Sequence, residues 1–197
     1  MAVPDIATLS LGIAAQAASV AEAQSEATEA MSKVMAALID NGVAEEDIQT
    51  QYFSIRQVTK WDRETEEEVV VGYRVTNKVT AKIRDIDKAG AIIDAVAEAG
   101  GDLTRIDGIS FSVDDPSAYY EEARQEAMAD AEAKAEQLAE LAGVTLGKPT
   151  YISEGISYPI YPRNYMYDVA GAAPETPISP GEMEISLTVQ VVYAILG

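Results

Sequence analysis

The stretch PSAYYEEARQEAMADAEAKAEQLAELAGVTLG, residues 116–147, predicts one long helix around which the other elements of the chain can pack. Asp114 and Asp115 precede Pro116, and an acidic cap followed by proline in the first turn is typical of a helix start. Gly143 can take the left-handed conformation that ends a helix. One face of this helix carries Tyr120, Ala123, Ala127, Ala131, Leu138 and Leu141. Because alanine is small, we expect this face to lie close to a sheet.

Periodic patterns on both sides of the long helix predict eight further elements. Alternating apolar residues indicate strands, and apolar residues three or four apart indicate helices. The predicted strands cover residues 5–16, 47–61, 69–83, 103–113, 148–153 and 182–196, and the predicted helices cover residues 19–42 and 85–99. Ser19 and Glu22 form a capping-box pattern at the first of these helices. The adjacent aromatics Tyr52 and Phe53 interrupt the alternation of their strand and indicate a bulge.

The order of these elements predicts an α+β fold. The first six form a β-α-β-β-α-β series, which is the order of a ferredoxin-like unit. The long helix and two further strands follow it. We expect a single domain over residues 1–197, built either around one core or as two lobes. The last strand alternates without a break, so Leu187 is expected to be buried and Thr188 to be more exposed.

Composition excludes several classes of function. The net charge is −19, with 33 acidic and 14 basic residues, and such a surface repels phosphate backbones, so nucleic acid is not expected as a partner. The sequence contains neither Cys nor His, which removes thiol chemistry, Ser-His-Asp triads and the usual ligands of zinc, copper and haem. We therefore expect no enzymatic activity and no cofactor. We also expect no transmembrane segment and no signal peptide within these residues, because no suitable apolar stretch is present.

Residues 155–181, GISYPIYPRNYMYDVAGAAPETPISPG, predict an irregular loop rich in Tyr and Pro. Five prolines in this stretch prevent regular structure. Tyr and Arg are typical of interface centres, so the first group of candidate interface residues is Tyr158, Tyr161, Arg163, Tyr165 and Tyr167. A long irregular loop is also compatible with mobility or with a small-molecule site. Of these three interpretations we favour the contact role, and a small-molecule ligand is not expected.

The strand predicted over residues 69–83 carries a second group of candidate interface residues. One phase of its alternation is apolar and includes Val69, Val71 and Val75, interrupted by Asn77, which we expect to be a satisfied amide rather than a ligand-binding one. The other phase carries Arg74, Lys78, Lys82 and Arg84. These cations can meet carboxylates of the same subunit or an acidic patch on a second copy of the chain. The sequence leaves both possibilities open.

The segment EARQEAMADAEAKAEQLAELAGVTLG resembles the signature of the SIMPL-domain family. Four other segments match the same family: PDIATLSLG, DIQTQYFSI, GYRVTNKVTAKIRDIDKAGAIIDA and PISPGEMEISLTVQVVY. The resemblance therefore covers nearly the whole chain. Members of the family are mostly bacterial periplasmic or outer-membrane immunogens and proteins linked to oxidative-stress defence, so the resemblance implies an extracytoplasmic location.

The same resemblance implies self-assembly, because relatives form large ring-like or channel-like homo-oligomers. We therefore expect a non-enzymatic, extracytoplasmic, stress-related protein whose partner is a second copy of itself. The alternative is a monomeric module that binds a protein or a small molecule through the Tyr-rich loop. The mass in solution separates the two, since a monomer at micromolar concentration favours the module.

Overall fold

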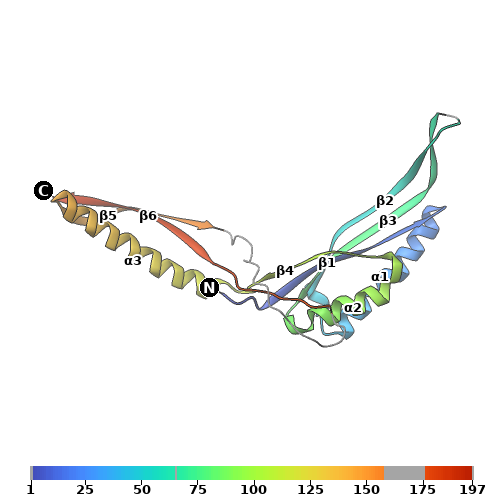
Figure 1. Cartoon of the computed structure of the whole chain (residues 1–197), viewed down its shortest axis with the longest axis horizontal. Coiled ribbons are helices and arrows are strands. Elements are labelled where there is room, and N and C mark those ends of the chain that lie inside the picture. The colour runs from blue at the N-terminus through green and yellow to red at the C-terminus, as the bar shows by residue number, and fades with distance from the viewer. Residues whose placement is uncertain (1, 65, 158–175, 197) are drawn as a thin grey trace. The chain divides into compact units, whose positions relative to one another are not determined.

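The computed structural model describes residues 2–64, 66–157 and 176–196, and these residues form two compact units (Figure 1). Unit 1 contains residues 2–4, 113–157 and 181–196, and unit 2 contains residues 5–64, 66–112 and 176–180. Each unit combines helix with an antiparallel sheet. The expected α+β class is therefore confirmed.

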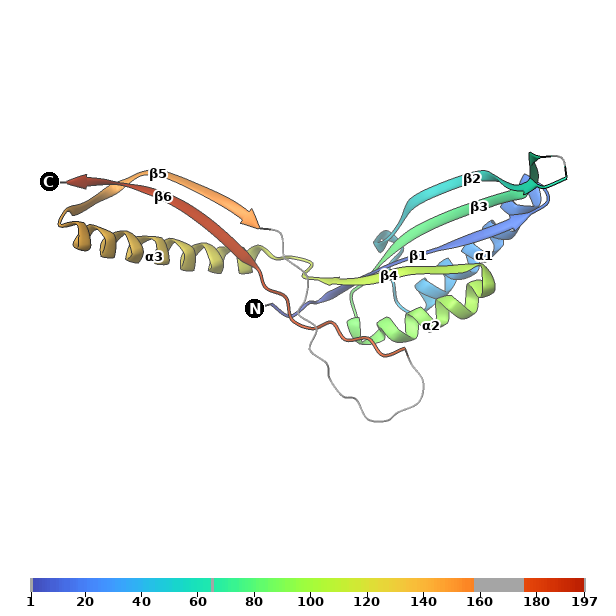
Figure 2. The same cartoon turned by 45° about the horizontal axis from the view of Figure 1, so that its top comes forward.

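Unit 2 is a four-stranded sheet with two helices on one face (Figures 1 and 2). Its elements are β1 (Ile6–Ala17), α1 (Val20–Asp40), β2 (Ile48–Asp62), β3 (Glu67–Ile83), α2 (Ala89–Gly100) and β4 (Thr104–Ser112). Three short 3₁₀ helices precede β2, α2 and β4: η1 (Glu45–Asp47), η2 (Ile86–Lys88) and η3 (Gly101–Leu103). The strand order is β2-β3-β1-β4, and every neighbouring pair is antiparallel.

The core of unit 2 lies between this sheet and its two helices. The largest side chains that are fully buried are Leu9, Leu11, Ile13, Val34, Leu38, Val75, Ile83, Ile92 and Val96. They come from β1, α1, β3 and α2, which shows that both helices contribute to the same core. The expected capping box starts α1: Glu22 N donates to Ser19 Oγ at 3.3 Å, and Ser19 N donates to Glu22 Oε2 at 3.2 Å.

The β2–β3 ribbon differs from the prediction in two places. The register shifts between Thr50 and Tyr52, so the bulged residue is Gln51 and not the Tyr52–Phe53 pair. Pairing of β3 with β1 ends at Tyr73, while the ribbon continues past that point (Figure 1). Val69 and Val71 lie in this extension and are 44% and 50% exposed, although the alternation placed them in the buried phase.

Unit 1 packs the long helix α3 (Ser117–Ala142) against two antiparallel strands, β5 (Thr145–Ser157) and β6 (Ser186–Leu196). Strand β5 is longer than the predicted 148–153, and it includes residues 155–157, which we had expected to begin the irregular loop. Strand β6 begins later than the predicted residue 182. Leu187 is half-buried and Thr188 is exposed, in the expected order.

The two ends of α3 have recognisable caps. We had expected Pro116 in the first turn after an acidic cap, but Pro116 itself occupies the cap position. Asp115 Oδ1 accepts a hydrogen bond from Ser117 N at 3.0 Å. A hydrogen bond with the Ser117 side chain, and then this backbone hydrogen bond, lower the pKa of Asp115. At the other end, Gly143 has φ 68° and ψ 30°, which is the left-handed conformation expected for it.

The face by which α3 meets the strands is an alanine stripe that matches the predicted face in its first half, at Ala123, Ala127 and Ala131, and departs from it towards the end of the helix. Its half-buried or buried members are Ala123, Ala127, Ala131, Ala135 and Ala139. Leu138 and Leu141 were expected on this face, yet they are 67% and 79% exposed. A row of residues spaced by four is inclined to the helix axis by about 26°, so contact with a twisted pair of strands winds around the helix. The prediction assumed a face parallel to the axis.

Candidate functional site: the open face of the sheet

The face of the unit 2 sheet that points away from α1 and α2 is the candidate site, and we call it the open face. Arg74, Lys78 and Lys82 lie on it, because they alternate along β3 with core residues. Cross-strand pairing adds Thr8, Ser10, Gly12, Ala14 and Gln16 from β1, Tyr52, Ser54 and Arg56 from β2, and Arg105 and Ser110 from β4. The open face thus combines hydroxyl groups, small residues and cations.

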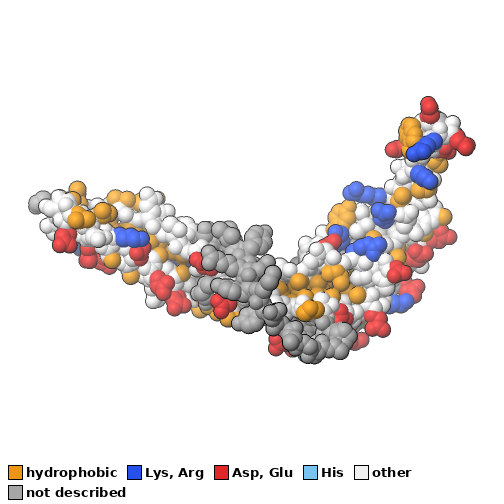
Figure 3. All heavy atoms as spheres, viewed as in Figure 1, with side chains coloured by type: hydrophobic (Ala, Val, Ile, Leu, Met, Phe, Trp, Pro, Cys, Tyr) orange, Lys and Arg blue, Asp and Glu red, His pale blue; other side chains and the backbone are white. Residues whose placement is uncertain are grey.

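The open face is basic although the chain is acidic. Arg74, Lys78 and Lys82 form one row along β3, which we call the basic row, and Arg56 lies opposite Arg74 on β2. Arg105 of β4 is opposite Gly12 on the same face. Figure 3 shows Lys and Arg side chains gathered over β2 and β3. The structure therefore brings together three of the four cations that the sequence placed in one phase.

A salt bridge fixes the middle of the basic row. Lys78 Nζ lies 2.8 Å from Asp107 Oδ2 of β4, across the intervening strand β1. Gly12 makes room for this contact, because a Cβ at that position would lie 2.5 Å from the carbonyl oxygen of Asn77 and 2.9 Å from Lys78 Cγ. The Lys78 side chain remains 39% exposed. At one end of the row, Arg74 Nη2 donates to Gln16 Oε1 at 2.8 Å.

Arg84 stands apart from the other three predicted cations. It lies just beyond β3, and its guanidinium donates to both carboxylate oxygens of Asp47, at 2.7 and 3.0 Å. The Asp47 side chain is only 7% exposed. A carboxylate with so little exposure is stabilised by a paired cation, so this ion pair joins Arg84 to η1 within unit 2.

Sequence reasoning missed Tyr52, Arg56 and Arg105 as members of the open face. Arg56 Nη2 donates to the Tyr52 hydroxyl at 3.0 Å. The pKa of Tyr52 is lowered, first by a hydrogen bond with Ser54 and then by the charge of Arg56. The bulge at Gln51 reverses the alternation of β2, so that Ile48 and Phe53 share one side of the sheet. Following the parity separately on each side of the bulge would have placed Tyr52 and Arg56 on the open face.

Asn77 does not behave as the satisfied amide that we expected. Its Oδ1 atom is buried and has no hydrogen-bond partner among the described residues, and the same holds for Thr104 Oγ1. Both residues are paired with Ile13, Asn77 on β3 and Thr104 on β4. They therefore point to the helix-covered side of the sheet and not to the open face.

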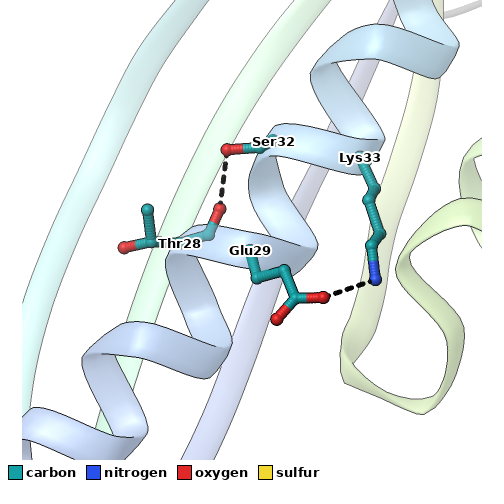
Figure 4. A network of polar contacts seen from close by, with 4 residues as sticks. All are labelled: Thr28, Glu29, Ser32 and Lys33. Atoms are coloured by element: carbon teal, nitrogen blue, oxygen red, sulfur yellow. Dashed lines mark hydrogen bonds and ion pairs between the residues drawn. The ribbon is translucent and has the colours of Figure 1, made fainter.

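A hollow between α1 and α2 offers a weaker candidate. It has a volume of about 310 Å³ and is lined in part by Glu26, Glu29, Lys33 and Glu98. Lys33 Nζ contacts Glu29 Oε1 at 2.8 Å (Figure 4), and this hydrogen bond and charge lower the pKa of Glu29. On the same helix, the Ser32 hydroxyl donates to the Thr28 carbonyl at 2.8 Å. These contacts are local and exposed, so they do not converge on a ligand.

Within residues 2–64, 66–157 and 176–196, no group of three or more His, Cys, Asp or Glu side chains is placed to hold a metal ion. No helix in the described part of the chain is long and apolar enough to cross a membrane. The loop candidates Tyr158, Tyr161, Arg163, Tyr165 and Tyr167 lie outside the described residues. The open face is therefore the surface on which a functional hypothesis can be built from contacts.

Comparison with known proteins identifies the family. The family model described as "SIMPL: Protein of unknown function (DUF541)" matches residues 1–193. This chain belongs to the SIMPL family. The resemblance found in the sequence is confirmed, and the family description assigns no reaction.

Three curated relatives show how the similarity is distributed. The 26 kDa periplasmic immunogenic protein of Brucella melitensis is 35% identical over 205 residues, which cover 98% of this chain and 79% of the relative. The uncharacterized protein YggE of Edwardsiella ictaluri is 30% identical over 176 residues, 89% of this chain and 72% of the relative. YggE of Escherichia coli K12 is 32% identical over 138 residues, 70% and 54% of the two chains. None of these names describes an enzyme.

Proposed function

We propose that this protein is an extracytoplasmic, non-enzymatic protein that works by assembling with copies of itself into a ring or channel. The Brucella relative that is named periplasmic supports the location. The family resemblance supports self-assembly and a role in stress defence. The open face of unit 2 supplies a surface through which copies of the chain can associate.

The observation that carries this proposal is the basic open face on a chain of net charge −19. An antiparallel sheet can face water on one side, but here the exposed side gathers cations in a molecule whose remaining surface is rich in carboxylates. Two copies therefore carry complementary surfaces even though their net charges repel each other. A contact between two different surfaces is head-to-tail, and it closes into a ring when the rotation between copies allows it.

The direct test is the mass in solution at two salt concentrations. Raising the salt from about 0.1 M to about 1 M shortens the Debye length from about 10 Å to about 3 Å, which weakens contacts between exposed charges. We expect an oligomer at low salt and a smaller mass at high salt. A monomer at micromolar concentration under both conditions would contradict the proposal and favour the monomeric binding module.

A pair of charge reversals locates the contact. Lys78→Glu with Lys82→Glu should abolish the oligomer while circular dichroism shows an intact fold. Lys33→Glu with Lys88→Glu changes the net charge by the same amount away from the open face. In the described part of the chain, the ion pairs of these two lysines are local and lie on exposed side chains. The control variant should assemble like the unmodified protein. Unchanged assembly of the first variant would remove the open face from the interface.

A further inference from the structure

We propose that the outer side of α3 in one copy docks on the open face of unit 2 in the next copy. The docking surface of α3 is the acidic ridge, which consists of Glu122, Glu126, Glu136 and Glu140. This docking rests on the self-assembly proposed above and names the two surfaces that meet.

The acidic ridge is a continuous exposed side of α3. With 100° between successive residues, its four carboxylates lie within about 40° of Glu122 around the helix. Ala129 and Ala133 occupy the middle of the ridge, and all six residues are exposed. The ridge is opposite the alanine stripe that packs on β5 and β6, so docking leaves the packing of unit 1 intact.

The ridge lacks cations of its own. Within the described residues none of its four carboxylates has an ion pair, because the two cations of α3 are engaged elsewhere: Arg124 contacts Glu154 at 2.6 Å and Lys134 contacts Asp130 at 2.7 Å. Like charges four residues apart, as at Glu136 and Glu140, weaken a helix. Glu140 also lies in the last turn, where the helix dipole disfavours a carboxylate. Cations supplied by another copy offset all three effects.

The lengths of the two surfaces match. From Glu122 to Glu140 the ridge spans about 27 Å at 1.5 Å per residue. From Arg74 to Lys82 the basic row spans about 26 Å at 3.3 Å per residue. Each end of the ridge can therefore meet an end of the row.

Small side chains allow a close approach between the two surfaces. Ala129 and Ala133 lie at the centre of the ridge, and Gly12 and Ala14 lie beside the basic row on β1. Helix α3 carries seven acidic and two basic residues, a net charge of −5. The chain thus contains within its own sequence an acidic helix that fits its own basic sheet, which favours a second copy over an unrelated partner.

Two charge-reversal variants test this docking. The sheet variant is Arg74→Glu with Lys82→Glu, and the helix variant is Glu126→Lys with Glu136→Lys. Each variant alone brings like charges together, so we expect the association constant to fall at least about tenfold, a change of about 1.4 kcal/mol. Circular dichroism should show that both variants keep their helix and strand content.

Mixing the two variants is the decisive experiment. In the mixture, the acidic ridge of the sheet variant meets the basic row of the helix variant, and the reversed ridge meets the reversed row. The oligomer should therefore return on mixing. A single chain that carries all four substitutions should also assemble, which provides a second measurement if one variant alone proves unstable.

The outcomes separate this docking from the proposed function. Glu26→Lys with Glu98→Lys adds the same charge as the helix variant, on exposed residues of α1 and α2, and should leave the mass unchanged. If the unmodified protein assembles and the helix variant assembles equally well, docking through α3 is wrong while self-assembly stands. If folded variants stay apart when mixed, docking is also wrong. If the unmodified protein is a monomer, self-assembly itself fails.

Discussion

Unit 2 and unit 1 contain similar elements but bury very different amounts of apolar surface. Unit 2 places two helices on four strands and fully buries nine large side chains. In unit 1, the buried hydrophobic residues among those described are Ala2 and Ala139. Large apolar side chains of unit 1 stay exposed, among them Leu138, Leu141, Ile152, Ile195 and Leu196.

The difference follows from the number of strands. Two strands alone are marginally stable, and one helix can cover only one side of them. An alanine stripe brings α3 close to the strands but removes little apolar area per residue. The stability of the chain should therefore reside in unit 2, and unit 1 has the surface that gains most from a partner copy.

The largest expected effect is the loss of stability when a core leucine of unit 2 is truncated, compared with the same change at an exposed leucine of unit 1. Leu11 is fully buried in β1, so Leu11→Ala should lower the free energy of unfolding by about 2–5 kcal/mol. Leu141→Ala in α3 is the matched control, because this leucine is 79% exposed and its truncation should change stability by less than about 0.5 kcal/mol. Urea unfolding of the two variants gives the measurement. Equal losses of unfolding free energy in the two variants would contradict the conclusion that unit 2 carries most of the stability.

A second substitution tests how closely β1 and β3 approach each other at Gly12, which is paired with Lys78 of the basic row. Gly12→Ala introduces a Cβ that would lie 2.5 Å from a backbone oxygen of β3, so the strands must shift. We expect a loss of about 1–3 kcal/mol in the free energy of unfolding. Gly155→Ala in β5 is the control in unit 1, because among the described residues its added Cβ would meet a single atom, at 3.8 Å. A stability of Gly12→Ala equal to that of the control would show that β1 and β3 are less close than described.

The third prediction concerns β6, the last strand of unit 1. Leu187 is half-buried, so Leu187→Ala should cost about 1–2 kcal/mol, less than the same change at Leu11. The reason is that the removed methyl groups already contact water in part. Hydrogen exchange, measured for each unit, would show whether the loss of stability lies in unit 1. A loss below about half a kcal/mol would mean that β6 is misplaced.

The sequence predicted the element types because each element shows its own periodicity. β1 alternates between core and open face, and the Ser19–Glu22 box marks the start of α1 with a local hydrogen bond. The errors arose where one element is shaped by another. Leu138 and Leu141 are exposed because twisted strands draw the contact along an inclined row of α3, and no pattern within the helix reports that twist.

The candidate site was predicted only where its residues share one strand. Arg74, Lys78 and Lys82 share one strand, so their common phase is readable from the sequence. Arg56 and Arg105 lie on other strands, and their membership depends on the cross-strand register. Arg84 follows the same phase but lies beyond the strand, where a nearly buried Asp47 binds it. The loop tyrosines remain a prediction.

The smallest expected effect concerns the ion pairs of two carboxylates, one in each unit. In unit 1, Arg124 of α3 donates to Glu154 of β5 at 2.6 and 3.0 Å, and this contact lowers the pKa of Glu154 from its ordinary 4.5. In unit 2, Lys33 lowers the pKa of Glu29, but the two residues are one turn apart on α1. The first pair joins two elements and the second joins none.

Titration of the two carboxylates by NMR should show this difference. Arg124→Gln should raise the pKa of Glu154 towards 4.5, and Lys33→Gln should do the same for Glu29. Because the folded pKa of Glu154 is lowered, the stability from its pair is complete above the unfolded value and is lost as pH falls through the folded value. Arg124→Gln should therefore speed hydrogen exchange in β5 at neutral pH and have no effect at acid pH. Lys33→Gln should have a smaller effect of the same sign, confined to α1, because its pair lies within one helix. Equal exchange in β5 for Arg124→Gln and the unmodified protein at neutral pH would show that the alanine stripe alone holds α3 to the strands.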